Sequence, residues 1–156
     1  ANNNLWLNTR NPNIHSLKDF TEKDRIAVPS LKVWVLVGDG SLLMNLGSLV
    51  TIANAAPKNF VHCLCENGTY ETNGSVPIPR AGQFRFVDMA KAAGYGKTYD
   101  FSNLWDWDYE LDNILKEDGP IFVDLKVEPG EAYPEDFRRL YSIEYRAKFR
   151  EVLKKS

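Results

Sequence analysis

Several features that would identify particular classes of protein are missing from this sequence. Only two cysteines occur in 156 residues, and no second cysteine pair exists to complete a structural zinc site. No apolar run approaches the length of about 20 residues that a membrane-spanning helix needs. The formal net charge of −2 provides no electrostatic basis for binding nucleic acid or an anionic membrane surface.

The N-terminal part of the chain lacks the clear periodicity found further on. It also lacks the basic and apolar regions of a secretory signal peptide, so we expect a cytoplasmic protein. Only two short strands are predicted there, at residues 5–7 and 25–28. We therefore predict an atypical segment at residues 1–31, followed by one domain at residues 32–156.

A buried parallel strand is predicted where the pattern changes. Residues 33–37 form a continuous β-prone apolar run, which is typical of a strand covered on both faces. Gly38-Asp39-Gly40 ends this run, and Ser41 is placed to cap a helix that continues to about Ala56. The next strand is predicted at residues 60–65. A strand, a helix and a strand in this order indicate a right-handed βαβ unit.

Both cysteines belong to this second predicted strand. Cys63 and Cys65 are two residues apart, so their side chains point to the same face of the strand. We interpret them as small core residues in preference to a metal or disulfide role. The neighbouring His62 is also interpreted as structural.

Strands and helices continue to alternate after this unit, which predicts an α/β fold with a mostly parallel sheet. The polar stretch at 66–83 is a long loop, and such loops inside a compact domain are more often functional than idle. Residues 121–127 are expected to form a strand near a sheet edge. The elements expected after the loop are a helix at 84–93, a strand at 97–99, a helix at 104–116, the strand at 121–127 and a final helix at about 134–154.

The strongest functional signal is Gly38-Asp39-Gly40. It lies at the carboxyl end of a predicted parallel strand and opens a helix, and ligands bind at that edge of open α/β sheets. The free amides of a helix N-terminus suit a phosphate, and the glycines allow the backbone to approach it closely. A carboxylate beside a phosphate needs a cation between them, and Mg²⁺ is the usual one.

Asn67 follows the next predicted strand and should lie at the same edge of the sheet. Its side-chain oxygen and a backbone carbonyl of the following turn can join Asp39 around one magnesium ion. Phosphate oxygens and a water would complete the octahedron. Other motifs fail, because a dinucleotide fingerprint needs glycine where Leu43 stands, and the P-loop-like Gly96-Lys97-Thr98 follows a helix.

This motif resembles that of thiamine-diphosphate enzymes. Gly38-Asp39-Gly40 is followed after 26 residues by Asn67, as in the family's paired Gly-Asp-Gly and Asn-Asn sequences. Glu66 replaces the family's first Asn, whereas the second Asn, which is the usual ligand, is kept. The resemblance covers about residues 32–127 and is similar to phosphonopyruvate and sulfopyruvate decarboxylases. It implies a three-layer sandwich of the thiamine-diphosphate-binding type, incomplete on its N-terminal side.

The resemblance also implies roles for individual residues. Asp39 and Asn67 would bind Mg²⁺ through their side chains, and Thr69 would bind it through its backbone oxygen. Tyr70 and Glu71 follow where proton-transfer groups often lie; Glu71 is either a desolvated general acid or base, or a solvated loop carboxylate. The residues implied to contact the cofactor are Gly38, Asp39, Gly40, Ser41, Asn67, Gly68 and Thr69.

The activity implied by the resemblance is decarboxylation of a small 2-oxo acid, with thiamine diphosphate as the electron sink. A separate pyrimidine-binding domain activates the cofactor in such enzymes, and we do not expect that domain within this chain. The chain is therefore expected to act as a decarboxylase-type lyase only when a pyrimidine-binding domain or subunit completes it, in a homo- or hetero-oligomer.

Two other functions stay open at this point. The chain could be a catalytically inactive product of a truncated or fused gene that keeps the fold. Residues 1–29 also resemble a piece of periplasmic substrate-binding proteins of the nitrate/sulfonate transporter type, which suggests a solute-binding module. That segment is too short to form the two lobes such a module needs.

Overall fold

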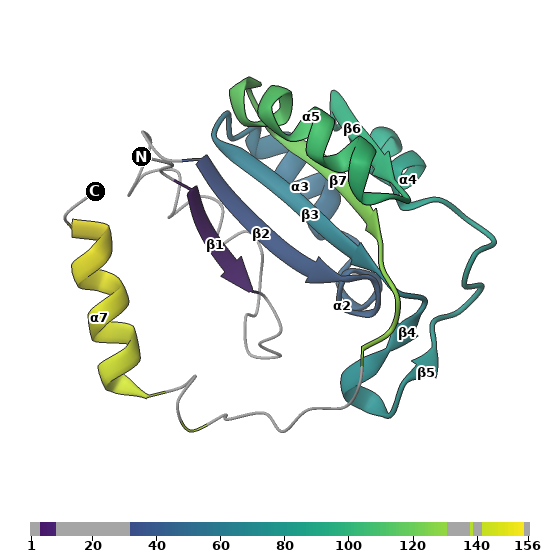
Figure 1. Ribbon diagram of the computed structural model, residues 1–156, viewed down its shortest axis with the longest axis horizontal. Coiled ribbons are helices and arrows are strands. Elements are labelled where there is room, and N and C mark those ends of the chain that lie inside the picture. The colour runs from purple at the N-terminus through teal and green to yellow at the C-terminus, as the bar shows by residue number, and fades with distance from the viewer. Residues whose placement is uncertain (1–3, 9–31, 131–137, 139–141, 155–156) are drawn as a thin grey trace.

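The computed structural model describes residues 4–8, 32–130, 138 and 142–154 (Figure 1). Its main feature is a sheet of five parallel strands in the order β1-β2-β3-β7-β6. The strands and helices are β1 Asn4–Asn8, β2 Lys32–Gly38, α2 Asp39–Met44, α3 Ser48–Ala55, β3 Phe60–Glu66, β4 Thr69–Tyr70, η1 Glu71–Asn73, β5 Val76–Pro77, α4 Phe86–Ala93, β6 Lys97–Phe101, α5 Leu104–Lys116, β7 Ile121–Lys126 and α7 Ile143–Lys154.

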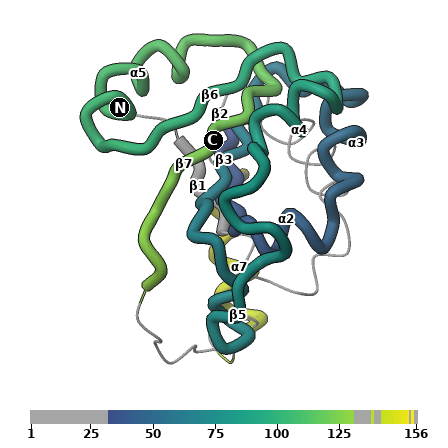
Figure 2. Tube along the Cα trace, turned by 90° about the vertical axis from the view of Figure 1, so that its right-hand side faces the viewer, coloured from purple at the N-terminus to yellow at the C-terminus, as the bar shows by residue number. Residues whose placement is uncertain are grey.

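Helices cover both faces of the sheet, so the predicted α/β sandwich of three layers is confirmed. Figure 2 shows the sheet from the side, with α5 on one side of the strands and α3 and α4 on the other. Each face has its own core. The core under α3 and α4 includes Val33, Val35 and Phe122, and the core under α5 includes Trp34, Val61 and Ile114.

The predicted strand at residues 33–37 is confirmed as part of β2, and its two faces explain the unbroken apolar run. Val33 and Val35 face the α3–α4 core, whereas Trp34 packs edge-on against Trp107 of α5 at a centroid distance of 5.9 Å. Because both faces of the strand are covered, the run from Val33 to Val37 is apolar throughout. The interpretation of Cys63 and His62 as core residues of β3 is also confirmed, since both are buried.

The single helix predicted from Ser41 to Ala56 is wrong. The chain forms two helices, α2 and α3, separated by a turn at residues 45–47 that contains Asn45 and Gly47. Both residue types favour turns over helix interiors. The helix also begins at Asp39 rather than after Ser41, and Gly38 occupies the N-cap position without a side-chain cap.

The strand predicted near a sheet edge at residues 121–127 is confirmed as β7, which lies next to the edge strand β6. β7 pairs with β3 on one side and with β6 on the other, and its first four residues are buried. Asp124 and Lys126 gave the strand its late polar character. They belong to a group of paired charges at the carboxyl end of the sheet, where β7 lies between β3 and β6.

Most other predicted elements are confirmed with shifted ends. The predicted strand at 97–99 extends to residue 101, and the long loop after β3 contains a small antiparallel pair, β4 and β5. The predicted strand at 5–7 is confirmed as β1, whereas the one at 25–28 lies outside the described residues. The final helix is confirmed for residues 143–154. Among the described residues, no helix combines the length and apolar character needed to cross a membrane.

Candidate functional site

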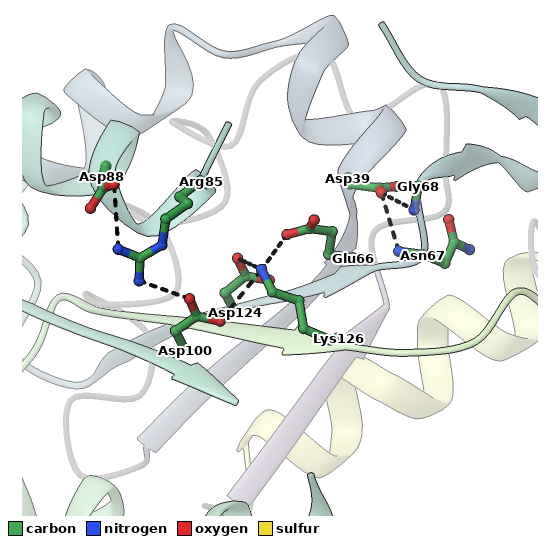
Figure 3. Close-up of polar contacts among 9 residues, drawn as sticks. All are labelled: Asp39, Glu66, Asn67, Gly68, Arg85, Asp88, Asp100, Asp124 and Lys126. Carbon is green, nitrogen blue, oxygen red and sulfur yellow. Dashed lines mark hydrogen bonds and ion pairs between the residues drawn. The ribbon is translucent and has the colours of Figure 1, made fainter. Parts of the chain in front are cut away.

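The carboxylate of Asp39 connects the carboxyl ends of two neighbouring strands. Asp39 follows β2 directly and is 1% exposed. Its Oδ2 accepts hydrogen bonds from the backbone amides of Asn67 (3.1 Å) and Gly68 (2.6 Å), which follow β3 (Figure 3). Its Oδ1 accepts one from the amide of Gly40 at 2.7 Å. The structure therefore brings together the residues that the sequence predicts for one site.

The environment of Asp39 acts on its ionisation in two directions. Burial raises the pKa of the Asp39 carboxyl, and the hydrogen bonds from Gly68, Gly40 and Asn67 oppose this effect. The negative charge of Glu66 adds to the increase. A cation beside Asp39 would favour the ionised form, because a buried carboxylate with an opposite charge nearby is stabilised.

Asn67 closes the turn that follows β3. Its Oδ1 accepts hydrogen bonds from the backbone amide of Thr69 at 2.9 Å and from the Thr69 hydroxyl at 3.1 Å. Gly68, between them, has a φ of +76°, a conformation that favours glycine. The turn therefore holds the Asn67 and Gly68 backbone amides against Asp39 and the Asn67 side chain against Thr69, at the edge where the sequence predicts ligands for a metal.

The two glycines that flank Asp39 have different surroundings. A Cβ atom on Gly40 would lie 2.5 Å from the Tyr70 ring, whereas a Cβ on Gly38 would meet no atom within 4 Å. From the sequence, these glycines are expected to allow the close approach of a ligand. In the structure, the neighbour that requires glycine at position 40 is Tyr70, whose ring lies against the start of α2. Ser41, the next residue, is half-buried.

The Glu71 carboxylate has a structural contact. Its Oε1 accepts a hydrogen bond of 2.5 Å from the backbone amide of Gly130, which follows β7. Glu71 thus connects η1, between β4 and β5, to the segment that follows β7. This contact favours the role of an anchor over that of a free acid or base.

A network of charged side chains lies beside the Asp39 site and was missed by the sequence analysis. Lys126 Nζ lies 2.5 Å from Glu66 Oε2, 2.8 Å from Asp124 Oδ2 and 3.4 Å from Asp100 Oδ1. Arg85 continues the network through Asp100, at 3.0 Å (Figure 3). The available signal was the pair of charges two residues apart at the end of an apolar strand, which places both on one face.

The ionisation of this network follows from its burial. Asp124 is fully buried, which raises the pKa of its carboxyl, while the hydrogen bond from Lys126 acts in the opposite direction. Burial alone would lower the pKa of Lys126, but the hydrogen bonds to Asp124 and Glu66 outweigh it and raise that pKa. Lys126 is therefore a permanent cation at neutral pH.

The chemistry of the Asp39 site fits a hard cation that bridges to a diphosphate. The candidate ligands are a carboxylate, an amide oxygen and backbone carbonyls, which are the oxygen donors that Mg²⁺ takes in proteins. The described residues hold no group of three or more His, Cys, Asp and Glu side chains suited to a metal. A zinc-type centre is therefore not found in this part of the chain, whereas the mixed oxygen set is present.

Comparisons with known proteins agree with this geometry. The chain is 39% identical over 99 residues to phosphonopyruvate decarboxylase from Streptomyces hygroscopicus, covering 63% of this chain and 24% of that protein. It is 36% identical over 102 residues to sulfopyruvate decarboxylase subunit beta from Methanothermobacter thermautotrophicus, covering 65% and 51%. The chain thus matches about a quarter to a half of the length of these relatives.

A solved structure shares the fold. A structure from Mycobacterium smegmatis, described as a thiamin diphosphate-dependent enzyme, aligns with a TM-score of 0.58 and 23% identity over 70% of this chain and 20% of that one. Residues 23–125 match the family described as thiamine pyrophosphate enzyme, C-terminal TPP binding domain. This match begins before the boundary predicted at residue 32, and that boundary stays a prediction. With two thirds of its residues in this match, the chain belongs to the thiamine pyrophosphate enzyme family and carries its C-terminal TPP-binding domain, related to the 2-oxo acid decarboxylases.

Proposed function

We propose that this chain binds the diphosphate of thiamine diphosphate through Mg²⁺, as a subunit or part of a 2-oxo acid decarboxylase. The observation that carries the proposal is the buried Asp39 carboxylate, which is hydrogen-bonded to the Asn67 and Gly68 amides across the ends of β2 and β3. An acidic oxygen fixed at this edge of a parallel sheet is suited to a cation that a phosphate shares.

The metal ligands in this proposal are the side chains of Asp39 and Asn67 and the backbone oxygen of Thr69. The turn supports this assignment because it holds the Asn67 side chain against Thr69 and the Asn67 backbone against Asp39. Rigid placement of the ligands lowers the ordering cost of binding. The residues proposed to line the diphosphate are Gly38, Gly40, Ser41 and Gly68.

Thiamine diphosphate bound here would supply the electron sink for loss of carbon dioxide from a 2-oxo acid. The chain's own residues would hold and orient the diphosphate end of the cofactor. Tyr70 is placed to restrict access of water, since its ring covers Gly40 beside Asp39. Glu71 is bound to the Gly130 amide, so we propose that it anchors the loop around the site.

The proposed partner is a pyrimidine-binding domain or subunit, in a homo- or hetero-oligomer. One relative is named as a beta subunit, and the chain matches only half of its length and a quarter of phosphonopyruvate decarboxylase. The names of these relatives support a small 2-oxo acid with a second anionic group as the substrate class.

Calorimetry with thiamine diphosphate and MgCl₂ tests the proposal. Wild type should bind the cofactor in a magnesium-dependent manner, and Asp39→Ala should reduce the affinity at least about 100-fold, because the charged metal ligand is removed. Asp118→Ala is the matched control, since Asp118 pairs on the surface with Lys58 at 3.4 Å. Equal binding by wild type and Asp39→Ala would rule out the assignment of the metal site.

A further inference from the structure

Glu66 and Lys126 form a direct contact between the ends of two paired strands. Glu66 is the last residue of β3, and Lys126, the last residue of β7, is its partner in the sheet register. Their side chains meet at 2.5 Å, and the Glu66 side chain is only 14% exposed. Glu66 also stands where the family's Asn-Asn motif has its first Asn. The glutamate at this position is therefore paired with the ammonium group of Lys126.

Lys126 is itself held from the interior of the sheet. Its ammonium group contacts Asp124 at 2.8 Å, and Asp124 is fully buried in β7, between β3 and β6. Asp100 of β6 approaches the same ammonium group at 3.4 Å. A lysine with three carboxylates around it loses the mobility of a surface side chain, so its position is set by β6 and β7 together.

The peptide group between Glu66 and Asn67 connects the end of β7 to Asp39. The Glu66 carbonyl accepts a hydrogen bond from the Val127 amide at 2.9 Å. The nitrogen of the same peptide group belongs to Asn67 and donates to Asp39 Oδ2 at 3.1 Å. Because a peptide group is planar and rigid, its orientation is fixed by both bonds, with β7 on one side and Asp39 on the other.

We propose that Lys126 is a positioning residue for the diphosphate-binding site. By holding the Glu66 side chain while the adjacent Val127 amide holds the Glu66 carbonyl, Lys126 fixes the Glu66–Asn67 peptide group and thereby the amides that orient the Asp39 carboxylate (Figure 3). The role toward Mg²⁺ rests on the proposed function, whereas the positioning of the Asn67 and Gly68 amides does not.

Lys126 has a second consequence for the charge balance of the site. If Lys126 were removed, the Glu66 carboxylate would be a largely buried negative charge near Asp39 that has lost its ion pair with Lys126. Such a charge raises the pKa of Asp39, because it repels the ionised Asp39 carboxylate. The pair therefore allows a glutamate directly before Asn67 without forcing the Asn67–Gly68 turn away from Asp39.

Amide hydrogen exchange in the ligand-free full chain tests the positioning directly. In Lys126→Met, the Asn67 and Gly68 amides should exchange at least about tenfold faster than in wild type, relative to the core amide of Cys63. Lys97→Met is the matched control: Lys97 pairs with Glu117 at 3.6 Å, and it begins the strand that Phe101 ends. Glu66→Gln removes the same ion pair from the other side and should act in the same direction, which covers the case in which Lys126→Met does not fold.

The second measurement is the magnesium affinity at a fixed concentration of thiamine diphosphate, by calorimetry. Lys126→Met and Glu66→Gln should weaken it at least about tenfold, and Lys97→Met should leave it unchanged. Unchanged exchange at Asn67 and Gly68 would overturn the positioning role, and changed exchange with unchanged magnesium affinity would overturn its importance for the cofactor. Failure of wild type to bind magnesium and cofactor would instead contradict the proposed function, while the exchange data still decide the positioning.

Discussion

The carboxylate of Asp39 accepts a 2.6 Å hydrogen bond from the backbone amide of Gly68, 29 residues further along the chain. This bond joins the start of α2, directly after β2, to the turn after β3. A charge-assisted hydrogen bond of this length is among the stronger polar contacts in proteins. Its consequence is that the two segments of the binding motif form one unit, although each segment alone would be an ordinary turn.

Substitution of the two glycines around Asp39 should destabilise the protein to different extents. Gly40→Ala places a Cβ 2.5 Å from the Tyr70 ring, so we expect a loss of about 1–3 kcal/mol in the free energy of unfolding from overpacking. Gly38→Ala, whose Cβ would meet no atom within 4 Å, should cost less than about 1 kcal/mol. Urea unfolding of both variants measures the difference.

The clash can be assigned to Tyr70 by a double mutant. Tyr70→Ala in the Gly40→Ala background should recover stability relative to the sum of the two single changes, because the contact that causes the strain is absent. Additive effects would show that Gly40→Ala destabilises the protein through the backbone and not through Tyr70.

The parts of the fold that were predictable from the sequence depend on local patterns. The apolar run of β2 and the Gly-Asp-Gly that ends it place Asp39 at the carboxyl edge of a parallel sheet without any knowledge of the strand order. The helix from Leu104 to Lys116 was predictable for the same reason, since Asn103 caps it through a 2.9 Å bond from the Asp106 amide.

The remaining features depend on contacts between distant segments. The Lys126–Glu66 pair joins residues 60 positions apart, and it requires β7 to lie beside β3, which no local pattern specifies. The break between α2 and α3 was missed because apolar residues continue through Leu46, which is exposed in the structure. A pattern of residue types does not distinguish a buried leucine from an exposed one.

Stability should fall in mild acid because of His62. Burial lowers the pKa of His62 to about 3, against 6.5 for a solvated histidine. The unfolded chain binds a proton below pH 6.5 and the folded chain does not, so this contribution is complete above pH 6.5 and is lost as the pH falls toward 3. The slope is about 1.4 kcal/mol per pH unit, or roughly 2 kcal/mol between pH 6.5 and pH 5.

Urea unfolding at pH 8 and pH 5 checks this prediction, with His62→Gln as the comparison. Glutamine does not titrate and retains a polar atom for Tyr95, whose hydroxyl lies 3.1 Å from His62 Nδ1. The variant should be less stable than wild type at pH 8, and its loss of stability on going to pH 5 should be smaller by about 2 kcal/mol. An equal loss in both proteins would mean that another group controls the acid sensitivity.

The C-terminus of α4 provides a test of backbone conformation. Gly94 has a φ of +110° and its added Cβ would lie 3.3 Å from that of Ala53 in α3. Gly94→Ala should therefore lower the free energy of unfolding by about 1–2 kcal/mol. Gly96→Ala, two residues later, meets no atom within 4 Å and should change stability by less than about 0.5 kcal/mol. Similar melting temperatures for the two variants would contradict the assigned conformation.

Glu71 allows the structural and catalytic interpretations to be separated. Glu71→Gln keeps an oxygen that can accept the Gly130 hydrogen bond, so stability and cofactor affinity should change little, whereas Glu71→Ala should lose about 0.5–1.5 kcal/mol. If Glu71 is an anchor, Glu71→Gln should retain the decarboxylation rate of the enzyme completed by its pyrimidine-binding partner. A general acid or base contributes about 10²–10⁴-fold to a rate, so a decrease of that size in kcat, with cofactor binding unchanged, would instead assign proton transfer to Glu71.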